Sequence, residues 1–317
     1  MGSNNSAKSI VLEALLLASN PFRALSPAVS YPIDFLINKH TTVEDNVGAA
    51  FLFYNYISDR AKIAVDGREL NLYKDKDNAV YFSLEGSLEG QFSKSPINID
   101  GTSITGNWIG IVYPSGMKNP YYKGKGITGD AFLFDPRTMS AMLKIIMDNW
   151  INVVNSGILS KVALEMSEFS HEKYVNFTQE PFYNQIYTIY AFTENGSRIR
   201  LSDLGEGMQV YFATRVIYEL LKPEFLLWDD IEAHFNPRII AHVANWFSDL
   251  VSSGKSVIIA THSLEAAKLI ARANEGTVII ARSLEDGKLK SRELKLDELE
   301  EFERAGIDVR MAEGFLL

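Results

Sequence analysis

The first residues that could do chemistry lie at the start of the chain. Residues 2–9 read GSNNSAKS and fit the phosphate-loop pattern G-x-x-x-x-G-K-[ST], except that Ala7 stands in place of the second glycine. In such a loop, backbone N–H groups and a helix N-terminus surround phosphate oxygens, a lysine reaches the β- and γ-phosphates, and a hydroxyl binds Mg²⁺. Lys8 and Ser9 would supply the last two groups. Taken alone, a linker running into a helix explains the same letters equally well.

A second candidate site follows a short apolar run, FLLWDD at residues 225–230. At the carboxyl end of a buried strand, an aspartate such as Asp229 can hold Mg²⁺, and the next acid, Asp230, can orient or deprotonate an attacking water. The alternative is a solvated pair of turn acids before a helix.

A third candidate site ends the apolar run SVIIAT and reads Thr261-His262-Ser263. A histidine at a strand terminus could contact a γ-phosphate. The competing explanation is structural, because Ser263 is an adequate N-cap for the following helix and a single histidine usually has a structural role.

The elements that must position these residues differ between the two halves of the chain. In the first 200 residues the patterns predict helices over 10–19 and 138–154. They also predict strands over 49–57 and 79–84, a hairpin over 61–73 that turns at Asp66-Gly67, and a hairpin over 187–201 that turns at Asn195-Gly196. Over 86–130 they predict loops around one strand. The Met and Trp residues of 138–154 recur on one helical face, which indicates core packing. After residue 200, helices over 207–221, 237–254 and 263–273 alternate with apolar strands over 224–229, 256–261 and 277–282, which predicts a parallel sheet covered by helices.

Together, the three motifs resemble those of the ABC-type ATPase heads, in particular the stand-alone AAA-like ATPases related to the OLD family and to the heads of SMC-like DNA-repair proteins. GSNNSAKSIVLEALLL is similar to that group's G-x-N-N-x-G-K-[ST]-x-x-L-E-A-L opening, LLWDDIEAHFNP to its LLIDEPEAHLHP segment, and IIATHS to its switch-histidine strand. A fourth segment, residues 201–209, resembles the signature loop, which in this family meets the ATP bound to the opposite subunit. Gly205 lies 24 residues before Asp229, and His262 lies 33 after it. This order and spacing favour a phosphate loop at the N-terminus.

The resemblance implies an α/β fold of the P-loop NTPase class and ABC-ATPase type. Its sheet would be mostly parallel and flanked by helices, with an antiparallel β meander and a helical insertion. We expect an N-terminal lobe with the phosphate loop and the meander over 1–110, a loop and helical insertion over 111–185, and a C-terminal α/β lobe over 186–317.

The resemblance also implies MgATP binding and hydrolysis to ADP and phosphate, with ATP and Mg²⁺ as the ligands. Ser9 and Asp229 would bind Mg²⁺, and the catalytic residues would be Asp230, which orients the water, and His262, on the γ-phosphate. The predicted nucleotide-binding residues are Gly2, Asn4, Asn5, Ser6, Ala7, Lys8, Ser9, Ser202, Gly205 and Gly207. Glu232 matches the second acid of the family segment, and a helix-entry acid is an equally good interpretation.

Four departures from the family pattern favour a rival function, a nucleotide-sensing switch or scaffold that binds ATP without useful turnover. Ala7 adds a methyl group where the backbone approaches phosphate. Asp230 replaces the usual glutamate and is one methylene shorter, and Gly205 stands where many signature loops have a serine, although Ser202 lies nearby. The strand that normally precedes the loop would lie before Gly2, so either an upstream segment supplies it or the fold is altered there.

Composition excludes several other classes of protein. The 317 residues include no cysteine, which excludes disulfides, thiolate nucleophiles and Cys-ligated zinc. A net charge of -9 argues against a broad nucleic-acid or anionic-membrane surface. We see no membrane-spanning apolar run and no signal peptide, so we expect a cytoplasmic protein without membrane insertion. From the resemblance, the expected partners are a second copy in an ATP-dependent homodimer and an unknown protein, or DNA through a partner.

Overall fold

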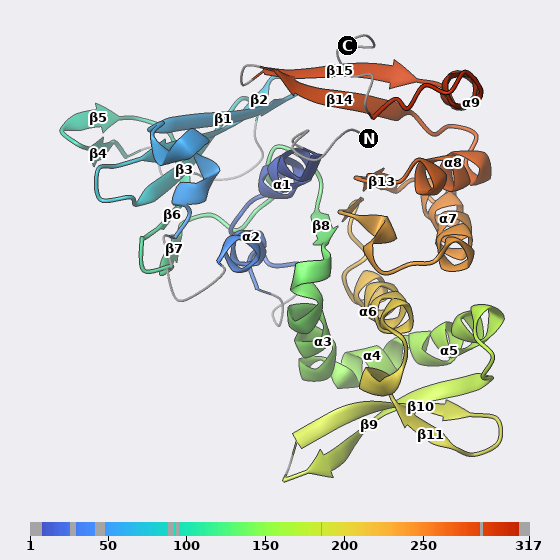
Figure 1. Cartoon of the computed structure of the whole chain (residues 1–317). Helices are drawn as coiled ribbons and strands as arrows, with labels where there is room; N and C mark the ends of the chain where they lie inside the picture. Colours follow the sequence, from blue (N-terminus) through green and yellow to red (C-terminus); the bar gives the residue numbers. More distant parts are fainter. Residues whose placement is uncertain are drawn as a thin grey trace. The chain divides into compact units, whose positions relative to one another are not determined.

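The computed structural model describes residues 8–25, 30–41, 48–87, 92, 95–184, 186–285 and 288–310. The chain forms two compact units, which are taken one at a time (Figure 1). The first comprises Met1–Leu12, Phe134–Lys222 and Leu226–Leu317, and the second comprises Glu13–Leu133 and Pro223–Phe225. This division follows contacts within the chain, and the three lobes expected from the sequence stay a prediction.

An antiparallel sheet with the order β1-β2-β3-β6-β7 dominates the second unit. Its strands are β1 (Arg60–Val65), β2 (Arg68–Lys74), β3 (Val80–Glu85), β6 (Asn107–Val112) and β7 (Lys118–Pro120). Asp66 and Gly67 have φ values of 50° and 74°, and Val65 pairs with Arg68. The two-residue turn with positive φ at both positions is the predicted hairpin, because its twist matches that of the flanking strands.

Two predictions for the second unit were wrong. Residues 49–57 form the short helices η1 (Ala50–Leu52) and η2 (Tyr54–Tyr56) in place of a strand. Tyr56 has a φ of 60°, and its N–H donates to the Phe53 carbonyl at 3.0 Å, so local bonds satisfy the backbone despite the β-favouring aromatic residues. The expected loop region contains a further hairpin, β4 (Ile97–Ile99) and β5 (Thr102–Ile104).

Helix α1 (Lys8–Ala18) begins in the first unit and confirms the predicted N-terminal helix, and α2 (Pro32–His40) follows in the second. In the first unit, the predicted helix over 138–154 is interrupted, giving α3 (Met139–Asp148) and α4 (Trp150–Ser156), and α5 (Ile158–Phe169) follows. Asn149 ends α3, and its amide donates to the Ile145 carbonyl at 2.7 Å. Because the helix is interrupted, the apolar residues of 138–154 do not share one buried face. Met142 is buried as predicted, whereas Ile151 is 77% exposed.

A three-stranded antiparallel sheet in the first unit lies next to α4 and α6 (Glu206–Leu221) (Figure 1). Its order is β11-β10-β9, with β9 (Tyr174–Tyr183), β10 (Ile186–Thr193) and β11 (Arg198–Arg200). The β10–β11 hairpin is the one predicted from Asn195-Gly196. Phe177 of β9 packs on Phe212 of α6 with ring centroids 4.5 Å apart, and both side chains are fully buried. This contact ties the sheet to the helix.

The predicted alternation of helix and strand is present after residue 200. β12 (Phe225–Trp228), α7 (Pro237–Ser252), β13 (Ser256–Ile259) and α8 (Leu264–Ala273) follow α6 in that order. A three-stranded sheet has the order β13-β12-β8, where β8 is Ala131–Phe134. The carboxyl ends of these strands lie in the first unit. This parallel sheet and the separate antiparallel sheets confirm the mixed α/β class.

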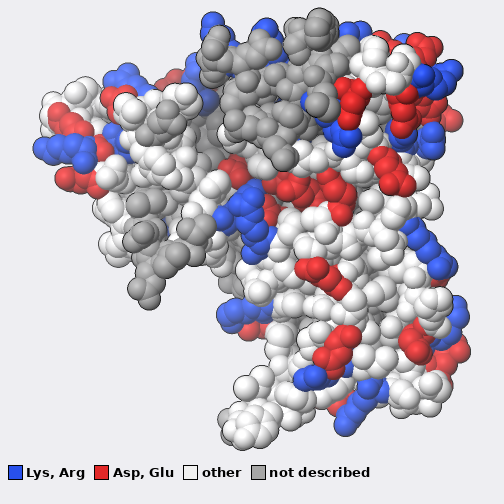
Figure 2. Space-filling model, in the orientation of Figure 1, with Lys and Arg blue, Asp and Glu red and all other residues white. Residues whose placement is uncertain are grey.

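The third predicted strand of this alternation is not in the parallel sheet. β14 (Ile279–Glu285) pairs antiparallel with β15 (Lys288–Leu294), and α9 (Leu296–Arg304) follows. Periodicity could not reveal this, because a buried apolar run looks the same in both kinds of sheet. Figure 2 shows Lys and Arg atoms beside Asp and Glu atoms around α8 and α9, where Lys268 pairs with Glu303 at 2.6 Å. Among the described residues, no helix has the length and apolar character needed to cross a membrane.

Candidate functional site

The candidate site in the first unit lies where two neighbouring strands end. The Asp229 N–H donates to the Phe134 carbonyl at 2.8 Å, and the Ala260 N–H donates to the Trp228 carbonyl at 2.8 Å. The first bond joins the residue after β12 to the end of β8, and the second joins the end of β12 to the residue after β13. Ligands bind outside the carboxyl ends of strands in α/β sheets, so the acids and the histidine meet where a ligand is expected.

The imidazole of His262 lies between a cation and an acid from distant parts of the chain. Lys8 Nζ is 3.0 Å from His262 Nδ1, and His262 Nε2 is 3.6 Å from Asp230 Oδ1. A lysine ammonium can only donate, so Nδ1 accepts and the proton of a neutral ring lies on Nε2, toward Asp230. The structure thus joins three residues that the sequence assigned to one phosphate site.

Asp230 has an unusual backbone and an unusual charge environment. Its φ of 46° lies in the left-handed region, which aspartate and asparagine tolerate better than other residues with side chains. Burial and the neighbouring Asp229 raise the pKa of the Asp230 carboxyl, against the opposing effect of His262. A carboxyl with a raised pKa in a pocket is typical of a group that exchanges protons.

A shallow hollow adjoins Asp230 in the first unit. Its lining is mainly apolar and includes Trp228, Ile231 and Met142. These side chains remove water from one side of the carboxyl, which is the physical cause of the desolvation that raises its pKa.

Glu232 contacts the residues that follow β13. Its Oε2 accepts from the Thr261 hydroxyl at 2.7 Å, and its Oε1 accepts from the His262 N–H at 2.5 Å. Of the two interpretations of this acid, the geometry supports a place at the site. Ser263 also caps α8, with its hydroxyl accepting from the Ala266 N–H at 3.1 Å, so the structural explanation for Ser263 is correct as well.

Only part of the predicted phosphate loop can be described. Gly2, Asn4, Asn5, Ser6 and Ala7 lie outside the described residues. Lys8 and Ser9 begin α1, and Lys8 is 8% exposed. A lysine and a hydroxyl residue in the first turn of a helix fit a phosphate site, because the helix N-terminus favours negative charge.

The donor set suits Mg²⁺ that arrives with phosphates. Asp229 offers a carboxylate that is 2% exposed, and Ser9 offers a hydroxyl. Mg²⁺ is usually bound by one or two carboxylates together with substrate phosphates and waters. Among the described residues, no cluster of three or more acidic, His or Cys side chains could hold a metal alone.

The predicted signature loop contains two kinds of glycine. Ser202 and Gly205 are exposed, and a Cβ at Gly205 would meet nothing within 4 Å. A Cβ at Gly207 would lie 2.7 Å from the carbonyl oxygen of His234 in the same chain. Gly207 therefore has a packing role within the subunit, whereas Ser202 and Gly205 remain available to another molecule.

Sequence reasoning missed Arg310. Its Nη1 donates to the His262 carbonyl at 3.1 Å, and its guanidinium pairs with Asp308 at 2.6 Å. No motif marks this arginine, because its partner lies 48 residues earlier in the sequence.

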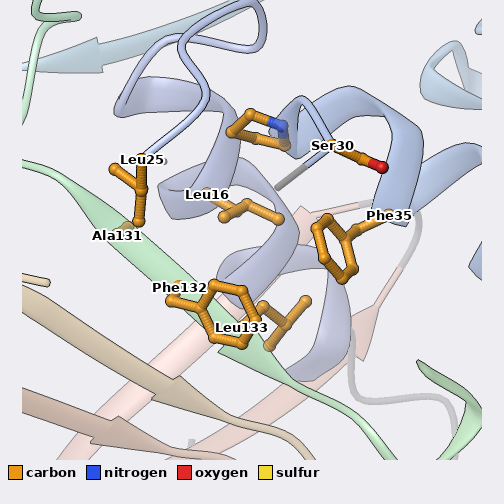
Figure 3. A pocket seen from close by; sticks show the side chains of 8 residues that line it. Leu16, Leu25, Ser30, Phe35, Ala131, Phe132 and Leu133 are labelled. Carbon is orange, nitrogen blue, oxygen red and sulfur yellow. The ribbon is translucent and has the colours of Figure 1, made fainter. Parts of the chain in front are cut away.

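A second shallow hollow belongs to the second unit. Figure 3 shows the side chains of Leu16, Leu25, Phe35, Phe132 and Leu133 around it. The lining is almost entirely apolar and includes none of the predicted site residues, so we assign it no part in the chemistry.

Sequence comparison agrees with the motifs. Residues 162–267 match the family described as "AAA domain, putative AbiEii toxin, Type IV TA system". The "Putative ABC transporter ATP-binding protein" of Methanocaldococcus jannaschii is 25% identical over 251 residues, which cover 77% of this chain and 81% of that protein. The chain is similar to the AAA-like and ABC-type P-loop ATPases. The matched residues 162–267 include Asp229, Asp230, Glu232 and His262.

Solved structures of SMC heads are also similar to this chain. The SMC head bound to the C-terminal winged-helix domain of ScpA has a TM-score of 0.47 at 15% identity, covering 95% of this chain and 90% of that one. The SMC head domain from Thermotoga maritima has a TM-score of 0.43 at 12% identity, covering 93% and 88%.

Proposed function

We propose that this chain is an ATPase head that binds MgATP and hydrolyses it to ADP and phosphate. The observation that carries the proposal is the His262 imidazole, which is 3.0 Å from Lys8 Nζ and 3.6 Å from Asp230 Oδ1. A phosphate-binding cation, a γ-phosphate contact and a water-orienting acid are the three protein groups that phosphoryl transfer to water requires.

Each residue has one role in this reaction. Lys8 has three donors, so it can keep its bond to His262 while it donates to phosphate oxygens. Ser9 and Asp229 would hold Mg²⁺, which neutralises charge on the phosphates when bound. The Asp230 carboxylate orients the attacking water and accepts its proton, and His262 contacts the γ-phosphate.

ATP-dependent homodimerisation belongs to the same proposal. The exposed Ser202 and Gly205 lie just before α6, where the resemblance implies contact with the nucleotide of a second subunit. Closure of the dimer would act on a protein partner, or on DNA through that partner. We also propose a cytoplasmic location, which suits a chain with no cysteine.

MgATP should raise the melting temperature of the protein. At a hundred times its dissociation constant, a ligand that binds only the folded state stabilises it by about 2.7 kcal/mol, roughly 4 °C for a chain of this size. Thermal denaturation with and without MgATP measures the shift. Lys8→Ala should abolish it, and Lys144→Ala should preserve it, since the Lys144 side chain is 74% exposed. An equal shift in wild type and Lys8→Ala would show that the phosphate-loop assignment is wrong.

A non-hydrolysable ATP analogue should produce a dimer that Gly205→Asp abolishes. Gly205 is exposed with open space around its Cα, so an aspartate fits the fold but places negative charge where the second subunit's phosphates are expected. Light scattering over a range of protein concentrations measures the dimer.

Gly276→Asp is the matched control for the dimer test, because a Cβ at Gly276 also meets nothing within 4 Å. Gly207→Asp is unsuitable, since its Cβ would press on the His234 carbonyl of its own chain. A monomer in every nucleotide state would contradict the dimer and favour the nucleotide-sensing switch.

A further inference from the structure

Charged groups hold the peptide of His262 from both sides. Glu232 Oε1 accepts from the His262 N–H at 2.5 Å, and Arg310 Nη1 donates to the His262 carbonyl at 3.1 Å. The donor is thus paired with an anion and the acceptor with a cation. Charge-assisted hydrogen bonds of this kind are about twice as strong as neutral ones, so the backbone at this position has little freedom to rotate.

Both holding groups are themselves fixed. The second oxygen of Glu232 accepts from the Thr261 hydroxyl at 2.7 Å. Arg310 donates to Asp308 through Nη2 at 2.6 Å and through Nε at 2.9 Å, which orients its planar guanidinium. Val309, between them in sequence, is 3% exposed in an apolar cluster with residues of α8, β14, β15 and α9. This cluster anchors the segment that carries Arg310.

The imidazole of His262 needs such fixation. Its side chain is 36% exposed, so packing constrains it little. Only a small range of ring orientations keeps both contacts, because Nδ1 must stay within reach of Lys8 while Nε2 faces Asp230. With weak packing, the direction of the ring depends on the placement of the backbone from which it projects.

We infer that Glu232 and Arg310 are positioning residues that hold His262 between Lys8 and Asp230. The inference rests on the proposed function, in which this ring contacts the γ-phosphate. It makes the segment after α9 part of the hydrolytic site.

The chain offers graded variants of each residue. Glu232→Ala removes both acceptors, whereas Glu232→Gln keeps an amide oxygen for the His262 N–H, and the Thr261 hydroxyl can accept from the amide nitrogen. Arg310→Ala removes the donor, and Arg310→Lys keeps a single donor without the fork that binds Asp308. Glu265→Ala and Arg304→Ala, at exposed positions on α8 and α9, are the controls.

Turnover at saturating MgATP should fall about 10- to 100-fold in Glu232→Ala and in Arg310→Ala, with KM little changed, because a misplaced group costs rate more than binding. Glu232→Gln should recover most of the loss.

A measurement without turnover separates this inference from the proposed function. Long-range ¹H–¹⁵N spectra of the nucleotide-free protein should show His262 as the Nε2–H tautomer in the wild type, in Glu232→Gln and in both controls. In the two alanine variants the ring should shift toward a mixture of tautomers. If the wild type has no Lys8-dependent turnover, the ATPase proposal fails and the spectra alone decide the inference. If the alanine variants keep the wild-type tautomer, Glu232 and Arg310 do not position His262, whatever their turnover.

Discussion

Replacing Asp230 by asparagine is expected to lower MgATP turnover about 10²- to 10⁴-fold, the usual contribution of a general base. The substitution preserves size and removes the group that accepts a proton from water. Asparagine also tolerates the left-handed backbone at this position, where φ is 46°. MgATP binding should therefore be unchanged, because the lost interaction acts mainly in the transition state.

Phosphate release and MgATP-induced thermal stabilisation, measured on the same preparations, test this result. Lys8→Ala must be measured alongside, because contaminating ATPases would give an equal background in all samples. Asp230→Glu keeps a carboxylate, so its turnover should stay well above that of Asp230→Asn. Equal turnover in wild type, Asp230→Asn and Lys8→Ala, with MgATP still bound by the wild type, would identify a nucleotide-gated switch.

The raised pKa of Asp230 also has consequences for pH dependence. The base must be ionised, so turnover should fall as pH decreases through a pKa that lies above the ordinary aspartate value. For stability, a carboxyl with a raised folded-state pKa contributes below its unfolded pKa, and that contribution is lost as pH rises through the folded pKa. Asp230→Asn should therefore be more stable than the wild type at neutral pH.

Replacing Arg215 by alanine is expected to destabilise the first unit by about 3 to 5 kcal/mol, because it leaves a partly buried carboxylate without its cation. Arg215 Nη2 and Nε lie 2.7 and 2.8 Å from the oxygens of Glu165, and the Tyr211 hydroxyl donates to Glu165 at 2.9 Å. The guanidinium also lies over the Trp246 ring, 4.4 Å from its centroid. These contacts join α6, the helix that follows the predicted signature loop, to α5 and α7.

Chemical denaturation of the two proteins measures this loss, and Arg198→Ala is the control. Arg198 pairs with Glu180, but its side chain is 57% exposed, so the loss there should be at most about 1 kcal/mol. An equal small loss in both variants would show that the Arg215 pair adds little to stability.

The same ion pair predicts a pH dependence. Burial alone would raise the pKa of Glu165, but hydrogen bonds and charge from Arg215 outweigh it and the pKa is lowered. The stabilisation is therefore present above the unfolded pKa and is lost as pH falls through the folded one. Arg215→Ala should show less of this acid-side loss.

Local chemistry made several parts of this protein predictable from its sequence. Asp66-Gly67 specifies a tight hairpin, because both residues tolerate positive φ, and the helix predicted over 237–254 begins at Pro237, a residue that suits the first helical position. In the structure, the Asn236 side chain accepts from the Ile239 N–H at 3.0 Å. Asp229 and His262 were placed at strand ends because apolar runs that stop at a polar residue mark where a buried strand ends. The same local reasoning also missed one turn, Asp100-Gly101, where φ values of 48° and 83° form the β4–β5 hairpin.

The tertiary structure alone decided which distant residues meet. Lys8 and His262 are 254 residues apart, and their contact depends on the tertiary fold, which no local pattern encodes. The same holds for Arg310 on the His262 carbonyl, for the His234 carbonyl that makes Gly207 a packing residue, and for the antiparallel pairing of β14. Periodicity and turn chemistry act over a few neighbouring residues, whereas the position of a catalytic group is set by side chains that pack across the whole fold.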